Sequence, residues 1–185
     1  PFNIPILLTW LRVALIPLVV GVYFLPTHWL PVAERNLAAT LVFIVAAVTD
    51  WFDGYLARRW NQTSAFGAFL DPVADKLMVA AALILLVHLE RADFALAFII
   101  IGREIAVSAL REWMARLGES RSVAVNFLGK VKTFTQMLAI PMLLYHQRIG
   151  AFDPQQWGEW LLFVAAILTL VSMAWYLRMA AMPKG

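Results

Sequence analysis

The sequence contains no cysteine, which excludes a disulfide framework and a thiolate metal site. It is also poor in charge, because Asp, Glu, Lys and Arg make up 15% of its 185 residues, whereas a soluble domain carries about a quarter. Hydrophobic residues reach 62%. One small core cannot hide so much apolar surface, so we expect much of the surface to face lipid. Neither a Ser/His/Asp arrangement nor a glycine-rich mononucleotide loop is visible.

Apolar stretches of membrane-spanning length follow one another along the chain, each near what a helix needs to cross ~30 Å of hydrocarbon. No internal repeat and no low-complexity segment interrupts them, so we interpret residues 1–185 as a single domain. The sequence predicts an all-α, polytopic bundle of six transmembrane helices. The stretches run roughly over residues 4–25, 36–58, 68–88, 94–116, 125–146 and 157–179.

The basic residues predict the orientation of this bundle. Lys and Arg concentrate in the cytoplasmic loops of membrane proteins. If the N-terminus is cytoplasmic, only Arg35, Arg91 and Arg148 among the 15 Lys and Arg residues fall in outer loops. We therefore expect both termini on the cytoplasmic side.

Four aspartates lie within the second and third stretches, where each costs about 2.5–3.5 kcal/mol on insertion scales. Asp50 and Asp53 are three residues apart, and Asp71 and Asp75 are four apart, so each pair shares a helix face. A short polar loop joins the two helices. An antiparallel hairpin would bring the four carboxylates to a similar depth, roughly 8 Å inside the bundle at 1.5 Å per residue.

Carboxylates gathered in one pocket repel one another and stay ionised together only if cations neutralise them. Hard oxygen ligands favour Mg²⁺, Mn²⁺ or Ca²⁺, and two divalent ions bridged by carboxylates recur in in-line phosphoryl displacement. The alternative is that the aspartates pair with Arg58, Arg59 or Lys76 and only tie the helices together. Small residues that would let a ligand approach the backbone closely accompany them: Gly54, Ala57 and Gly67.

A second polar group is basic. Arg103 lies deep in the fourth stretch, where either Glu104 or an aspartate neutralises it, or it binds an anionic substrate. Arg111 lies eight residues further on, roughly on the same helix face. Lys130 and Lys132 follow in the fifth stretch, and they either bind that anion or anchor the helix at the cytoplasmic interface.

Polar positions also interrupt the first apolar stretch. Asn3, Thr9 and Arg12 are the polar positions near the start of an otherwise apolar helix. Arg12 either lies at headgroup level or reaches the aspartate pocket, and the sequence leaves both open.

The segment from Asp50 to Asp75 carries the pattern D-x-x-D-G-x-x-A-R, then eight residues, then G-x-x-x-D-x-x-x-D, with every fixed position present. This segment resembles the signature of the CDP-alcohol phosphotransferase family. The runs 3–12, 65–76, 103–113 and 122–133 resemble family members whose acceptor is sn-glycerol 3-phosphate. The resemblance thus extends over nearly the whole chain.

The resemblance implies an enzyme of phospholipid biosynthesis. It would transfer the phosphatidyl group of CDP-diacylglycerol to sn-glycerol 3-phosphate and release CMP, with two divalent cations, Mg²⁺ or Mn²⁺. The implied metal ligands are Asp50, Asp53, Asp71 and Asp75, with Asp75 also the catalytic base. The implied nucleotide site comprises Asp50, Asp53, Gly54, Ala57, Arg58, Gly67 and Asp71. The implied acceptor-phosphate site comprises Arg103, Arg111 and Lys130, with Thr9, Arg12 and Lys132 as further candidates.

The resemblance also implies a homodimer in the bacterial cytoplasmic membrane, with the active site facing the cytoplasm and no nucleic-acid partner. One alternative keeps the chemistry and changes the acceptor to serine, inositol phosphate or phosphatidylglycerol. Another is a divalent-cation transporter that uses the same carboxylates. Transporters of this kind usually show inverted repeats or broken helices, and neither is visible in the sequence.

Overall fold

The computed structural model describes residues 3–62, 64–116 and 127–182, and these residues are largely helical, which confirms the predicted all-α fold. The helices correspond one by one to the apolar stretches. They are α1 (Ile4–Gly21), the short 3₁₀ helix η1 (Val22–Phe24), α2 (Val32–Trp60), α3 (Ala65–His88), α4 (Phe94–Arg116), α5 (Phe127–Tyr145) and α6 (Pro154–Ala181).

Helix ends follow local capping rather than hydropathy, so α2, α3 and α6 are longer than predicted. α2 ends where Asn61 adopts the left-handed conformation with φ of 50°. α3 begins after Ser64, whose hydroxyl accepts the amide of Gly67 at 3.0 Å. α6 begins at Pro154 behind the N-cap Asp153. The predicted start of the fifth helix, residue 125, lies outside the described residues.

Among the residues that the structure describes, three helices have the length and hydropathy of a membrane crossing. These spans are Ile4–Phe24, Val32–Trp60 and Pro154–Arg178, with mean hydropathies of 2.1, 1.5 and 2.1. The remaining helices, α3, α4 and α5, carry Asp71, Asp75, Arg103, Glu104 and Lys132 among their charges. Large apolar side chains are exposed on every helix, as expected of a membrane protein. A count of six crossings stays a prediction.

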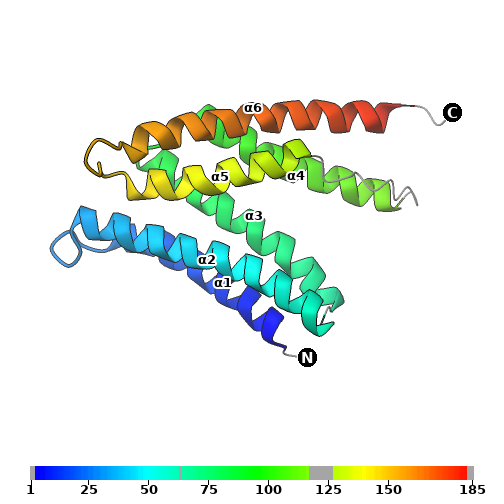
Figure 1. Cartoon of the computed structure of the whole chain (residues 1–185), viewed down its shortest axis with the longest axis horizontal. Helices are drawn as coiled ribbons and strands as arrows, with labels where there is room; N and C mark the ends of the chain where they lie inside the picture. Colours follow the sequence, from blue (N-terminus) through cyan, green and yellow to red (C-terminus); the bar gives the residue numbers. More distant parts are fainter. Residues whose placement is uncertain (1–2, 63, 117–126, 183–185) are drawn as a thin grey trace.

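The helices form two groups that meet along α3 (Figure 1). α1 packs against α2 and α3, while α6 packs against α5 and α4. Contacts between α2 and α5 and between α3 and α4 join the groups. α1 begins and α6 ends at the same end of the bundle, and the turn between α2 and α3 lies at that end too (Figure 1). This arrangement agrees with the predicted common side for both termini, and the cytoplasmic assignment of that side stays a prediction.

The apolar core occupies the half of the bundle remote from the α2–α3 turn. It draws on the first half of α2, through Phe43, and on the second half of α3, through Leu83 and Leu86. α5 and α6 pack closely there, since a Cβ added to Gly158 would lie 2.8 Å from Cγ of Leu143. The half of the bundle near the turn holds the aspartates instead.

The end of the bundle opposite the termini is held by buried arginines. Arg35 was expected in a loop, and that placement was wrong, because it lies in the first turn of α2 and donates to the Leu30 carbonyl at 2.8 Å. Arg91 does lie between α3 and α4, but it is buried. It donates to the Leu144 carbonyl at 2.9 Å and to Asn36 Oδ1 at 2.7 Å. Arg91 thereby satisfies a carbonyl that the end of α5 leaves without a helical partner.

Candidate active site

The four aspartates come together where α2 ends and α3 begins. Asp53 is buried, with 2% of its side chain exposed, while the side chains of Asp50 and Asp75 are 32% and 37% exposed. Asp71 is half-buried. The i,i+3 and i,i+4 spacings therefore place the carboxylates as predicted, with Asp53 deepest and the others lining its approach.

Arg12 of α1 lies among these carboxylates and is fully buried, with no exposed surface. Its Nη1 is 2.9 Å from Asp50 Oδ1 and 3.4 Å from Asp75 Oδ1, and its Nη2 pairs with Asp53 Oδ2. The sequence left open whether Arg12 lies at headgroup level or reaches the aspartate pocket, and the structure places it in the pocket. Among the described residues, the basic partner of Asp50, Asp53 and Asp75 is therefore Arg12, which comes well before all three in the chain, and not Arg58, Arg59 or Lys76.

Thr9, one turn before Arg12, connects the remaining aspartate. Its hydroxyl lies 3.1 Å from Asp53 Oδ2, within hydrogen-bond distance of Asp71 Oδ1, and 3.0 Å from the Pro5 carbonyl. A hydroxyl carries one hydrogen, so it donates to one of these oxygens at a time. Thr9 and Arg12 together contact all four carboxylates.

The donor set fits divalent cations by its chemistry. If all four carboxylates are ionised, one guanidinium leaves three negative charges unbalanced in a partly buried space. Carboxylate and hydroxyl oxygens suit Mg²⁺ and Mn²⁺. Within the described ranges, no group of three or more acidic or histidine side chains stands ready as a ligand set, and Arg12 lies between the carboxylates instead.

A cavity of 290 Å³ opens beside the aspartates between α3, α4 and α5. Asp71 and Asp75 line one side of it, and Glu104 and Lys132 line the other. The other lining residues are Pro72, Lys76, Val79, Thr133, Gln136 and Met137. The cavity therefore joins the acidic and basic groups that the sequence placed on separate helices.

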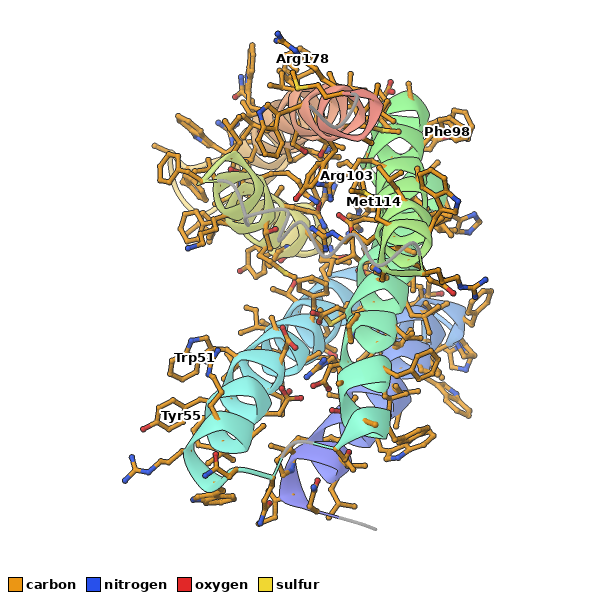
Figure 2. The ribbon with its side chains drawn as sticks, turned by 90° about the vertical axis from the view of Figure 1, so that its right-hand side faces the viewer. Trp51, Tyr55, Phe98, Arg103, Met114 and Arg178 are labelled. Carbon is orange, nitrogen blue, oxygen red and sulfur yellow. The ribbon has the colours of Figure 1, made fainter. Side chains whose placement is uncertain are left out.

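Glu104 is the counter-ion of the basic group. Its Oε1 accepts from Arg103 Nη1 at 3.1 Å and also pairs with Lys132 Nζ. Arg103 Nη2 donates to the Ser172 hydroxyl at 3.1 Å. Of the partners that the sequence left open for Arg103, Glu104 is the one found. Figure 2 shows Arg103 directed inward among α4, α5 and α6, whereas Trp51 and Tyr55 of α2 point away from the bundle.

None of the three predicted acceptor-phosphate residues, Arg103, Arg111 and Lys130, is among the residues that line the cavity. Arg111 donates to the Tyr176 hydroxyl at 3.1 Å, and its guanidinium carbon lies 5.6 Å from the centre of that ring. Arg103 lies 5.7 Å from the centre of the same ring, so both arginines make cation–π contacts with Tyr176. Lys130 is exposed on α5, and the lysine of α5 that lines the cavity is Lys132.

A smaller cavity of 90 Å³ lies between the start of α1 and the α2–α3 turn. The predicted nucleotide-site residues Ala57, Gly67 and Asp71 line it, together with Thr9. A Cβ added to Gly67 would lie 3.1 Å from Oγ of Ser64, so a larger residue would crowd this space. Gly54 and Arg58 are not among the lining residues.

An apolar groove of 550 Å³ runs between α2 and α5. Phe43, Val48 and Pro141 are among the side chains that line it, and Asp50 lies in its wall. The groove therefore runs along apolar side chains up to Asp50.

Sequence reasoning missed several residues of this site. Glu104 was considered only as a partner of Arg103, and Lys76 only as a partner of the aspartates, yet both line the cavity. Gln136 and Tyr176 were not singled out. Gln136 is one turn beyond Lys132 on α5, so helical spacing from that lysine was a signal for it. Tyr176 had no such signal, because its contacts depend on how α6 packs against α4.

Comparison with known proteins places the chain in a family. A sequence model of the CDP-alcohol phosphatidyltransferase family matches residues 2–171. The chain belongs to that family, and its site is built from the family's aspartate pattern on α2 and α3.

Within the family, the chain is similar to bacterial proteins of one name. It is 54% identical over 185 residues to the CDP-diacylglycerol–glycerol-3-phosphate 3-phosphatidyltransferase of Escherichia coli (strain K12), covering 97% of this chain and 95% of that protein. The proteins of the same name from Escherichia coli O157:H7 and Shigella flexneri serotype 5b (strain 8401) match it with the same identity and the same coverage.

Proposed function

We propose that this protein transfers the phosphatidyl group of CDP-diacylglycerol to sn-glycerol 3-phosphate, giving phosphatidylglycerol phosphate and CMP. The names of its relatives support these two substrates. The observation that carries the proposal is the cavity in which Asp75 and Lys132 face a common space. An acidic group that accepts a proton and a basic group that binds phosphate are what a phosphorylated alcohol requires of its site.

The chemistry assigned to the chain's own residues is a single displacement. A hydroxyl oxygen of the acceptor attacks the phosphatidyl phosphorus, the bond from that phosphorus to the oxygen bridging to CMP breaks, and CMP leaves with that oxygen. Asp75 accepts the hydroxyl proton. It suits this role because its side chain is 37% exposed, lines the cavity and has its closest Arg12 contact at 3.4 Å. The other contacted carboxylates, Asp50 and Asp53, lie closer to the guanidinium.

Asp50, Asp53, Asp71 and Asp75 would hold two divalent cations, Mg²⁺ or Mn²⁺. When bound, these cations would neutralise the charge of the diphosphate and of the departing CMP. The cavity lined by Ala57, Gly67 and Thr9 lies next to Asp71, so we assign it to the nucleotide. Gly54 and Arg58 stay predicted members of the nucleotide site.

The acceptor phosphate is assigned to the cavity of 290 Å³ that Asp75 lines. Two basic side chains, Lys132 and Lys76, also line this cavity. Arg103, Arg111 and Lys130 stay predicted members of the acceptor site. The two arginines are held in place by Tyr176, which orients them as a pair. A doubly charged phosphate favours such a group over any single cation.

The apolar groove between α2 and α5 is the place we assign to an acyl chain of the lipid substrate. We infer a multi-pass protein of the bacterial cytoplasmic membrane, with six crossings and the active site on the cytoplasmic side. The shared end of the termini and the α2–α3 turn supports this orientation (Figure 1), as does the surplus of basic residues predicted there. A homodimer remains an expectation from the family resemblance.

The proposed function is tested by an acceptor screen. Purified protein in detergent with labelled CDP-diacylglycerol is expected to release CMP and form labelled phosphatidylglycerol phosphate with sn-glycerol 3-phosphate. Serine, inositol phosphate and phosphatidylglycerol should give much less product. A different preferred acceptor would refute the assigned substrate. If no acceptor released CMP, the transferase itself would be wrong and a cation transporter would return as the alternative.

Replacing Lys132 with Met should raise KM for sn-glycerol 3-phosphate by roughly ten- to a hundredfold. This is the loss of affinity expected when a hydrogen bond to a charged group is removed. The reason is that Lys132 is the lysine of α5 that lines the cavity. KM for CDP-diacylglycerol should change little. Steady-state kinetics with each substrate varied in turn measure both values.

Lys130→Met is the matched control, because Lys130 is exposed two residues away on the same helix. Its effect on KM for the acceptor should be the smaller of the two. Equal effects, or a larger one at Lys130, would show that the phosphate does not bind where we place it.

A further inference from the structure

The first helix, which supplies none of the four carboxylates, contacts every one of them. Arg12 pairs with Asp50, Asp53 and Asp75. Thr9, one turn earlier, lies within hydrogen-bond distance of Asp53 and Asp71. Two residues on one face of α1 therefore connect the end of α2 to the start of α3.

The guanidinium of Arg12 is removed from water, because its side chain is 0% exposed. A charge removed from water is tolerated only with close partners of opposite sign. The three carboxylates in turn repel one another unless a cation lies between them. A planar guanidinium with several donors can reach three carboxylates at once, which a single ammonium does less well. The buried guanidinium and the clustered carboxylates therefore each need the other as counter-ion.

We propose that Arg12 is a positioning residue, a resident counter-ion that holds Asp50, Asp53 and Asp75 together while no divalent cation is bound. The inference rests on the cation site of the proposed function. Arg12 pairs with three of the carboxylates that would hold the cations, so Arg12 and the cations would compete for them. The protein can therefore fold and insert before it acquires metal, with the carboxylates already gathered.

The test is the melting temperature of the purified protein in detergent, followed through the fluorescence of its 8 tryptophans. In excess chelator, Arg12→Met should melt on the order of 10 °C below the wild type, as expected when a buried ion pair loses one partner. Mg²⁺ should close most of that gap, because the cation takes over the role of counter-ion. The wild type should gain less from Mg²⁺. Arg178→Met, at an exposed arginine of α6 labelled in Figure 2, should melt like the wild type in either buffer.

A second variant separates a counter-ion from a packing residue. Combining Arg12→Met with Asp50→Asn removes one of the repelling charges, so the double variant should melt above Arg12→Met in chelator. Loss of packing alone would not be repaired by that change. Arg12→Lys restores the positive charge but not the planar guanidinium with its several donors. Its melting temperature in chelator should lie between those of Arg12→Met and the wild type.

The outcomes separate this inference from the proposed function. If Mg²⁺ stabilises the wild type and Arg12→Met equally, and Asp50→Asn gives no repair, Arg12 is not the counter-ion and the cation site stands. If Asp50→Asn repairs Arg12→Met but Mg²⁺ shifts neither protein, the counter-ion stands and the cation site fails. An Arg12→Met protein that folds only with Mg²⁺ supports the inference. The inference is overturned if Arg12→Met fails to fold both with Mg²⁺ and when it is combined with Asp50→Asn.

Discussion

Asp75→Asn is expected to lower kcat by about 10²- to 10⁴-fold, the usual contribution of a positioned general base. The amide has the size and hydrogen-bonding reach of the carboxylate but cannot accept the hydroxyl proton. The substitution also removes one of the charges around Arg12, leaving the pairs with Asp50 and Asp53 in place. Folding should therefore be preserved, with a melting temperature near that of the wild type.

The measurement for Asp75→Asn is CMP release at saturating concentrations of both substrates, with the melting temperature recorded on the same sample. Glu34→Gln makes the same chemical change at an exposed position in the first turn of α2, at the opposite end of the bundle. It should keep wild-type turnover. Near wild-type turnover in Asp75→Asn would remove Asp75 from the role of base. A large fall in its melting temperature would instead assign Asp75 to folding.

Removing divalent cations should abolish transfer. Excess chelator is expected to lower CMP release by at least on the order of a hundredfold, because the charge that develops on the diphosphate then lacks its main stabilisation. Addition of Mg²⁺ or Mn²⁺ in excess over the chelator should restore the rate. The reason lies in the surplus of carboxylates, since one guanidinium cannot balance four of them.

Asp50→Asn sharpens this prediction. Asp50 is a proposed cation ligand with a side chain 32% exposed. Its amide variant should need at least roughly tenfold more free Mg²⁺ for half-maximal rate, whereas Glu34→Gln should follow the wild-type titration. A rate unaffected by chelator in the wild type would contradict the cation site altogether.

Much of this site followed from local patterns. The i,i+3 and i,i+4 spacings predicted two faces with paired carboxylates, and the structure brings them together. Helix existence followed equally well from hydropathy, since each apolar stretch corresponds to one helix. Helix ends did not, because they depend on capping contacts such as that of Ser64 with the Gly67 amide.

The basic half of the site shows where pattern reasoning stops. Arg103 and Arg111 were expected to share a face, and both contact Tyr176. The family resemblance implied Lys130 for the acceptor phosphate and left Lys132 as a further candidate, whereas Lys132 is the one of the two that lines the cavity. That difference is set by the rotation of α5 about its own axis, which depends on contacts with α2 and α6 rather than on the residues around the lysines.

By itself the sequence determined the helical class, the aspartate pattern and the family, because periodicity and spacing are local properties of the chain. The tertiary structure alone decided that Arg12 lies among the carboxylates and that Glu104 pairs with both Arg103 and Lys132. Contacts between residues far apart in the chain depend on the angles at which helices cross and on which faces they turn to one another. Those angles come from packing over the whole bundle, and no short segment encodes them.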